Sequence, residues 1–447
     1  MSLSLSSRKK EVLLTVSSNL TLQVVTALCG FVLPPLIIGT FGSPVNGMVS
    51  SISQFIAYLN IVEAGVGGAS IAALYKPLAL GDRAGRNGIL SATRTFYKRS
   101  GVLFTILIFI LAFVYPLLVG SEVDRLQSAL MVLVLGITGA AEFFLIGKYR
   151  VLLTADKKVY VISTVQFCAV LANTAVAVVL IRAGADIVTV KLASALVYLA
   201  RYVILALYVR RQYADVDFRS APDTGAISQS RNVLVHQIGG LVVFNSPLVI
   251  ITIFCSLKDA SVYTVYALVF NGVNQLLGSF SNGMQSFFGE SLVTDSMDRT
   301  RAIFSRYETL FFAVEGWFYG MAYLLIMPFM GLYTAKMTDA DYLQPGLAAL
   351  FVAVGVLNNL RCPSGQLINA AGHFKKTQLR SVAEAVINVV CSVGGVLVFG
   401  FKGVLFGAVV SGLYRGVDMI VYTSRHILHS VQAGLATFAK ILVATLV

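Results

Sequence analysis

Eight ionisable side chains stand inside stretches of sequence that are otherwise apolar, and they are the residues best placed to do chemistry. They are Glu63, Glu142, Arg201, Glu315, Arg361, Glu384, Arg415 and Asp418. A charged group is costly in apolar surroundings, so each is a candidate functional residue. The forked guanidinium of arginine binds phosphate oxygens, and fixed arginines facing a cavity would suit an anionic group such as a diphosphate.

Structural pairing is the competing interpretation of these residues. Arg415 and Asp418 are three apart, a spacing at which two side chains meet on one helix, and Arg361 could neutralise Glu384 or Glu142. Asparagine side chains within apolar runs could likewise line a cavity or bond between helices. The candidate substrate-cavity residues are Arg361, Arg201, Arg415, Glu63, Glu142, Glu384, Asn60 and Asn245.

Nothing in the sequence predicts an enzyme, a cofactor, a catalytic residue or a metal site. There is no phosphate-binding Gly-x-x-x-x-Gly-Lys-Ser/Thr loop, and the run "EAGVGGAS" from Glu63 favours close helix packing. Asp339 and Asp341 have the spacing of a sugar-phosphate metal clamp, but they lie in a short turn. The four histidines do not form a set with metal-ligand spacing.

The elements that must position these residues are membrane helices. Of the 447 residues, 57% are hydrophobic and 12% charged, whereas about a quarter of the residues of a soluble domain are charged. Such a chain is expected to form bilayer-spanning helices of about 20 residues, because lipid cannot satisfy exposed backbone groups. The net charge of +13 lies mainly in the connections, so we expect no nucleic-acid partner.

Apolar windows predict twelve spans and the start of a thirteenth. In the first half they cover residues 12–41, 45–78, 101–119, 126–146, 159–181 and 187–208. In the second half they cover residues 233–255, 262–293, 310–333, 343–370, 382–399 and 404–422. The thirteenth begins near Leu435, and we interpret the end at Val447 as an incomplete C-terminus.

Most lysines and arginines of the connections fall on one side of these spans. That side is expected to face the cytoplasm, with the N-terminus inside. The sequence therefore predicts a multi-pass protein of the inner, cytoplasmic cell membrane with a cytoplasmic N-terminus.

The two halves also resemble each other. At an offset of 213 residues Phe41 falls on Phe254, and at an offset of 216 Gly184 falls on Gly400. We predict an all-α integral membrane fold with two six-helix lobes related by a pseudo-two-fold axis along the membrane normal. The lobes would cover residues 1–212 and 231–430, a cytoplasmic linker residues 213–230, and the start of a further helix residues 431–447.

Several motifs carry a resemblance to a known family. They are "LNIVEAGVGGAS", "VHQIGG", "SVYTVYALV", "SFFGESL", "LINAAGHFKKT" and "AEAVINVVCSVGGVLVFGFKGVLFGAVVS". In this order and spacing the chain resembles the polysaccharide flippases of the multidrug/oligosaccharidyl-lipid/polysaccharide exporter superfamily. The resemblance covers residues 8 to 425. Relatives often carry an aspartate early in the seventh helix, where this chain has Asn245.

The resemblance implies a transporter that turns an undecaprenyl-diphosphate-linked oligosaccharide from the cytoplasmic to the outer leaflet by alternating access. Its partners would be that lipid-linked substrate and the bilayer, and could include a polysaccharide polymerase and export machinery. Two alternatives stay open. A cation-coupled multidrug exporter of the same superfamily would use the acidic side chains Glu63, Glu142, Glu315 and Glu384. A membrane polysaccharide polymerase or glycosyltransferase would need a long external loop, which the predicted connections do not provide.

Overall fold

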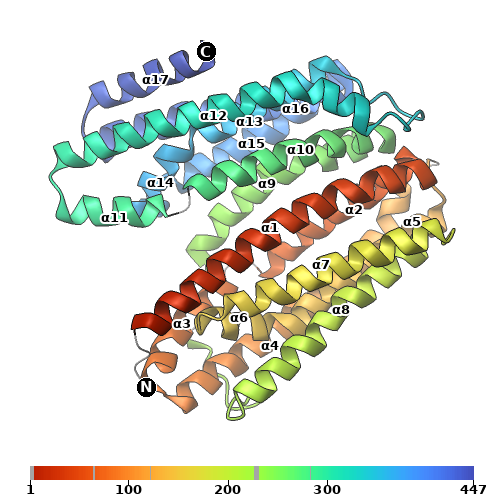
Figure 1. Cartoon of the computed structure of the whole chain (residues 1–447), viewed down its shortest axis with the longest axis horizontal. Helices are drawn as coiled ribbons and strands as arrows, with labels where there is room; N and C mark the ends of the chain where they lie inside the picture. Colours follow the sequence, from red (N-terminus) through yellow and green to blue (C-terminus); the bar gives the residue numbers. More distant parts are fainter. Residues whose placement is uncertain (1–4, 64–65, 121, 226–230, 282, 447) are drawn as a thin grey trace. The chain divides into compact units, whose positions relative to one another are not determined.

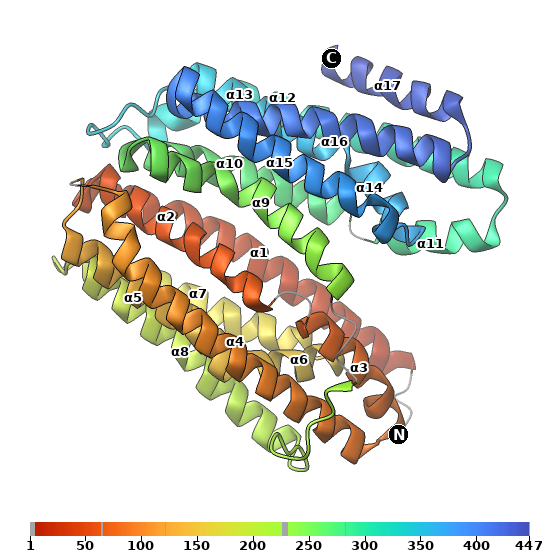
Figure 2. The same cartoon turned by 180° about the vertical axis from the view of Figure 1, so that it is seen from behind.

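The computed structural model describes residues 5–63, 66–120, 122–225, 231–281 and 283–446 (Figures 1 and 2). The regular elements of these residues are helices, so the predicted all-α membrane architecture is confirmed. The chain divides into two compact units, Met1–Gln237 and Ile238–Val447. Each unit is described by itself, and the predicted pseudo-two-fold axis stays a prediction.

Unit 1 contains eight α-helices with two short irregular helical segments between them. They are α1 (Leu5–Phe41), α2 (Ser43–Leu59), η1 (Asn60–Glu63), α3 (Val66–Leu80), α4 (Arg83–Leu118), α5 (Arg125–Ala141), η2 (Glu142–Ile146), α6 (Gly147–Ala155), α7 (Val159–Arg182) and α8 (Ile187–Gln212). The helices α1 and α7 lie side by side, as do α7 and α8 (Figures 1 and 2). The start of α8 is capped by Asp186, whose side chain accepts from the backbone N–H of Thr189.

Unit 2 is built from the remaining helices. They are α9 (Arg231–Phe254), α10 (Leu257–Ser281), α11 (Met284–Thr294), α12 (Met297–Tyr333), α13 (Pro345–Leu360), α14 (Cys362–Ala370), α15 (Phe374–Phe399), η4 (Gly400–Gly403), α16 (Val404–His426) and α17 (Val431–Leu446). The helix α17 packs on α12 and α16, so the predicted thirteenth helix belongs to this unit. Its last predicted residue, Val447, lies outside the described residues.

Within the described ranges, nine helical segments are long and apolar enough to cross a membrane. One of them, Lys376–His426, contains both the eleventh and the twelfth predicted spans, and Val66–Leu80, Gly239–Phe254 and Val431–Val443 are shorter apolar helices. The predicted eighth span, residues 262–293, is not among the nine. It is divided between α10 and α11.

Three predicted spans are interrupted, which the apolar windows did not indicate. The span 45–78 is divided between α2 and α3, and the span 343–370 between α13 and α14. Near the third interruption, between α10 and α11, Gly283 has φ +95°, a left-handed conformation that side chains with a Cβ rarely adopt. Hydropathy windows count apolar residues and are insensitive to such local breaks. Residues 64–65, within the glycine-rich run after Glu63, lie outside the described part.

The helices α15 and α16 form a close hairpin because glycines let their backbones touch. A Cβ on Gly403 would lie 1.9 Å from the carbonyl oxygen of Gly395, and one on Gly407 would lie 2.4 Å from that of Asn388. Ser392 Oγ donates to the carbonyl oxygen of Val404, 2.9 Å away, across the same contact. Small residues permit this approach between membrane helices.

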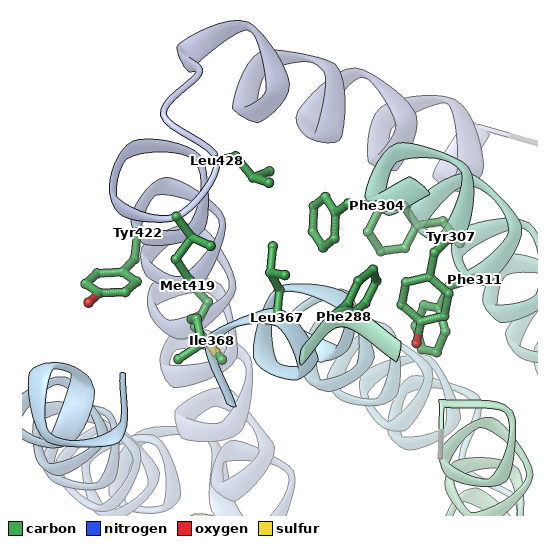
Figure 3. Packing of buried hydrophobic residues seen from close by; sticks show 11 residues of the cluster. Phe288, Phe304, Tyr307, Phe311, Leu367, Ile368, Met419, Tyr422 and Leu428 are labelled. Carbon is green, nitrogen blue, oxygen red and sulfur yellow. The ribbon is translucent and has the colours of Figure 1, made fainter. Parts of the chain in front are cut away.

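An aromatic core closes one end of unit 2, where α11, α12, α14 and α16 meet (Figure 3). Phe288 and Phe311 are fully buried there. The rings of Phe288 and Tyr307 are 5.6 Å apart and nearly perpendicular, an arrangement favoured by the ring quadrupoles. The core anchors α16, which carries residues of the site described next, and α14, which begins directly after another of them.

The segment after α8 is bound to α4. Arg86 Nη2 donates to the carbonyl oxygen of Asp215 at 2.9 Å, and Ser91 Oγ donates to that of Ser220 at 2.6 Å. The backbone N–H of Asp223 donates to the carbonyl oxygen of Gly88 at 3.1 Å. The described residues of the predicted linker, up to residue 225, therefore extend unit 1, and residues 226–230 lie outside the described ranges.

Candidate functional site

In unit 1, two carboxylates and two guanidinium groups form one network, here called the N-terminal ion cluster (Glu63, Glu142, Arg150 and Arg201). Arg150 pairs with Glu63, and its Nη1 lies 3.0 Å from Glu142 Oε1. Arg201 Nη2 lies 3.8 Å from the other oxygen of Glu142. Tyr97 donates its hydroxyl to Glu63 at 2.5 Å. Each charge thus has an opposite partner, as buried charges require.

The acidic residues of this cluster lie where helices lose their regularity. Glu63 ends the 3₁₀ segment η1 between α2 and α3, and Glu142 begins the π-helical segment η2 between α5 and α6. Short 3₁₀ and π segments within helices are frequent at functional sites. Gln166 on α7 accepts from Arg201, which fixes that guanidinium between α7 and α8.

In unit 2, three arginines and two carboxylates form the C-terminal arginine cluster (Arg361, Arg380, Glu384, Arg415 and Asp418). Arg361, at the break between α13 and α14, pairs with Glu384 of α15. Arg415 of α16 lies 3.3 Å from the second oxygen of Glu384 and 3.0 Å from Asp418 Oδ2. Arg380 pairs with the remaining oxygen of Asp418.

The two clusters differ in charge. The N-terminal ion cluster has two acidic and two basic members and is balanced, whereas the C-terminal arginine cluster has three basic members and two acidic ones. The side chain of Arg415 is 6% exposed and that of Arg380 is 36% exposed. The C-terminal arginine cluster thus has a net positive charge and is partly buried, and an added anion would stabilise it.

The candidate residues from the sequence are divided between these clusters. Glu63, Glu142 and Arg201 come together in unit 1, and Arg361, Glu384 and Arg415 in unit 2. The pairings of Arg361 with Glu384 and of Arg415 with Asp418, expected as the structural alternative, are present. The other suggested partner of Arg361, Glu142, pairs instead with Arg150 and Arg201 of unit 1.

The two asparagines are not members of either cluster, because both clusters are defined by ion pairs between charged side chains. Asn60 is exposed at the end of α2, three residues before Glu63. Asn245 is partly buried on α9, beside Ser246, whose hydroxyl donates to Asn388 Oδ1 at 2.8 Å.

Sequence reasoning missed Arg150 and Arg380 as members of the clusters. Both were placed in connections, because the predicted spans ended at residue 146 and began at residue 382. The helix α6 continues to Ala155 and α15 begins at Phe374, so both arginines lie within helices. The four-residue spacing from Arg380 to Glu384 indicates a shared helix face, but the ion pair of Arg380 is with Asp418 of another helix.

A basic pocket of about 200 Å³ lies in unit 1, beside the N-terminal ion cluster. Its lining residues are Arg94, Tyr97, Lys98, Phe143, Phe144 and Lys148. Three of the six are cationic and none is acidic. Arg94 is held by the carbonyl oxygen of Phe218, and the Lys148 ammonium lies 4.9 Å from the centre of the Tyr149 ring. The pocket is therefore suited to an anionic group.

A larger cavity of about 750 Å³ lies between α12 and α17 in unit 2. Its lining includes Phe312, Trp317, Met321 and Leu324, with Lys440 as its one charged residue. Lys440 is already bound to Glu308, 3.1 Å away. This cavity has apolar walls and offers few groups that could hold a charged head group.

Solved structures with the same arrangement of helices are transporters. An inward-facing multidrug resistance MATE family transporter of the MOP superfamily matches with a TM-score of 0.67 and 14% identity, covering 92% of this chain and 98% of that one. The MATE multidrug transporter DinF-BH matches with a TM-score of 0.64 and 16% identity, covering 92% and 95%. The chain has the MATE transporter fold.

An outward-facing MATE family transporter also has this fold, with a TM-score of 0.58, 14% identity, and coverage of 98% of this chain and 97% of that one. No protein-family model and no curated protein matches the sequence. At these identities the likeness shows the MATE fold alone, and function has to be argued from the site.

Proposed function

We propose that the chain is a membrane transporter that works by alternating access and carries a lipid-linked oligosaccharide from the cytoplasmic to the outer leaflet. The transport part is supported by the MATE fold, which solved transporters adopt in inward-facing and outward-facing conformations. A sugar head group cannot cross hydrocarbon unaided, and a diphosphate adds charge to it. A protein path for the head group is therefore needed.

The observation that carries the choice of cargo is the basic pocket. Arg94, Lys98 and Lys148 converge on it without a carboxylate among its lining residues. All three lie on the side of the membrane that the distribution of lysines and arginines predicts to be cytoplasmic. A diphosphate made in the cytoplasm would meet this pocket first, and the forked Arg94 side chain can bind phosphate oxygens in a bidentate manner.

The C-terminal arginine cluster supports the same chemistry. The cluster has three arginines and two carboxylates, so it carries one more positive than negative charge. The side chains of Arg361 and Arg380 are more exposed than that of Arg415. An incoming diphosphate oxygen can replace part of the carboxylate contact of Arg361. In this proposal Arg361 is the residue that neutralises the diphosphate during the crossing, with help from Arg415 of the same cluster.

The pocket is tested by removing its charge. The triple variant Arg94→Gln, Lys98→Gln, Lys148→Gln is expected to lower export of surface polysaccharide at least tenfold, while lipid-linked repeat units accumulate facing the cytoplasm. The accumulated units are measured by their accessibility to a membrane-impermeant glycosidase. Unchanged export at equal protein level in the membrane contradicts the proposal.

A matched control removes the same charge elsewhere. Arg125, Lys336 and Lys402 are exposed and lie on the side predicted to face outward. Replacing these three by Gln is expected to leave export within twofold of the parent. Arg361→Ala is expected to abolish export while the protein stays inserted, and normal export by that variant argues against the role of Arg361.

The second candidate is a cation-coupled multidrug exporter. The comparisons by themselves favour it, because the three matching structures described above are all named as multidrug transporters. It predicts that cells expressing the chain lose cationic dyes faster and tolerate higher drug concentrations. Dye efflux without any defect in polysaccharide export on deletion of the gene selects this function over the flippase.

A further inference from the structure

Two buried glutamates on α12 have opposite surroundings. Glu308 and Glu315 are seven residues apart, two helical turns along one face, and each is 2% exposed. Glu308 accepts from the Thr437 hydroxyl at 2.9 Å and from the Lys440 ammonium at 3.1 Å. Within the described part of the chain, neither carboxyl oxygen of Glu315 has a hydrogen-bond partner.

The Tyr319 hydroxyl, which interacts with the charge of Glu315, belongs to a separate hydrogen-bond network. Tyr319, one turn further along α12, donates its hydroxyl to Asn274 Oδ1 of α10 at 2.8 Å. Asn359 Nδ2 of α13 donates to the same Asn274 oxygen at 2.7 Å and to the Tyr319 hydroxyl at 3.2 Å. A Cβ at Gly355 would lie 2.2 Å from the Tyr319 ring. The absence of a side chain at Gly355 therefore makes room for this ring.

Two cations on the elements around α12 are also engaged. Lys440 of α17 binds Glu308, and Arg361, between α13 and α14, binds Glu384. The titratable neighbours that interact with the charge of Glu315 are the Tyr319 hydroxyl and the Cys362 thiol at the start of α14. The Cys362 thiol lies 3.2 Å from Ser281 Oγ of α10. Among the described residues, no cation pairs with Glu315.

A carboxylate without partners is strongly destabilised in an apolar interior, so this side chain is stable there only if it is neutral or if a cation accompanies it. The Asn274 oxygen that binds the Tyr319 hydroxyl already accepts two hydrogen bonds, so it is a poor ligand for a metal ion. A proton needs no further ligand. It converts the carboxylate to a neutral carboxylic acid in one balanced step.

We propose that Glu315 is a proton-binding site of unit 2 through which transport is coupled to the proton gradient. The coupling rests on the proposed transport function, whereas the proton site itself does not. Proton binding makes the buried face of α12 neutral at this point, and proton release is expected only in a conformation that admits water to Glu315.

Infrared difference spectra of the purified protein in lipid nanodiscs test the proton site. At neutral pH the parent is expected to show a C=O stretching band of a protonated buried carboxyl group, and Glu315→Gln should lack it. Glu308→Gln is the matched control, since it removes an equally buried glutamate that has a cationic partner, and it should keep the band. A band that persists in Glu315→Gln overturns the proposal.

A second variant covers the case in which Glu315→Gln does not fold. Glu315→Asp retains a carboxyl group at a different depth and should shift the frequency of the same band. An unshifted band in Glu315→Asp overturns the assignment to Glu315.

Coupling is measured separately in proteoliposomes that contain a lipid-linked oligosaccharide. An imposed proton gradient should stimulate transport by the parent at least fivefold and transport by Glu315→Gln less than twofold. Equal stimulation of both, or stimulation of the parent by a sodium gradient alone, overturns the coupling role. A protonated band without any transport contradicts the proposed function and leaves the proton site in place.

Discussion

Arg415 of α16 and Glu384 of α15 are joined at the centre of the C-terminal arginine cluster, with 3.3 Å between Nε and Oε2. The side chains are 6% and 7% exposed. Arg361 binds the other oxygen of the same carboxylate. One acidic side chain therefore holds two arginines, and its loss leaves the three arginines of the cluster with one acid, Asp418, which Arg361 does not contact in these ion pairs.

Glu384→Gln is expected to destabilise unit 2 by about 3–5 kcal/mol, the usual cost of removing one partner from a buried ion pair. The measurement is the thermal unfolding midpoint of the protein in detergent. Asp298→Asn is the control, because Asp298 is 91% exposed in its pair with Arg301 and should hardly change the midpoint. Equal midpoints for Glu384→Gln and the parent contradict the shared-carboxylate arrangement.

Arg150→Gln is expected to weaken unit 1, because Arg150 is the partner of both Glu63 and Glu142. The cost should be about 2 kcal/mol, since the side chain is 40% exposed and water screens part of the charge. Adding Glu142→Gln should recover part of this loss, since it removes an acid that has lost one of its cations. A double-mutant cycle measures the coupling, and strictly additive effects count against the network.

Gly407→Ala is expected to destabilise the α15–α16 hairpin by about 1–3 kcal/mol, because the new methyl group would lie 2.1 Å from Ser392 Oγ and 2.4 Å from a backbone carbonyl oxygen. Gly416→Ala, on the same helix, meets no atom within 4 Å and should be neutral or slightly stabilising. The comparison is of unfolding midpoints. Similar values for the two variants would falsify the backbone contact at Gly407.

The segment after α8 is expected to loosen from α4 in acid. Burial alone would raise the pKa of Asp215, but the hydrogen bond and charge of Arg86 and the charge of Arg83 outweigh it and hold the pKa below its usual value. A carboxyl whose folded pKa is lowered stabilises the fold fully above its unfolded pKa of about 3.9, and that contribution is lost as pH falls through the folded value.

Hydrogen exchange of residues 213–223 measures this loosening. Exchange should be slow at pH 7 and should speed up, after correction for its intrinsic pH dependence, as the pH falls below about 4. The effect should be small, because the Asp215 side chain is 36% exposed. In Asp215→Asn the segment should exchange faster at pH 7 and show no further acid step. A pH step that survives in this variant belongs to another group.

The spans were predictable because hydropathy is a property of consecutive residues. Each predicted span overlaps described helices, including the thirteenth near Leu435, which is part of α17, although residues 64–65 and 282 lie outside the described ranges. Helix interruptions were not predictable in the same way. The π-helical segment at Glu142 and the break at Arg361 depend on how α5–α6 and α13–α14 pack against their neighbours.

The members of the clusters were only partly predictable. Glu63, Glu142, Arg201, Arg361, Glu384 and Arg415 stand out because each interrupts an apolar run. Arg150 and Arg380 do not, since each lies where an apolar run gives way to polar residues. Their role depends on the true ends of α6 and α15, which exceed the apolar windows by several residues.

The sequence by itself determined that this chain forms apolar helices and which charged residues lie among them. The reason is that the free-energy cost of placing a charge in hydrocarbon depends on each residue individually. Only the tertiary structure decided which charges meet. The partners Arg361 and Glu384 come from different helices, and so do Arg150 and Glu63. The rotation and depth of each packed helix therefore determine which charged groups have partners. Glu308 is paired with a cation, whereas Glu315, two turns away, has none among the described residues.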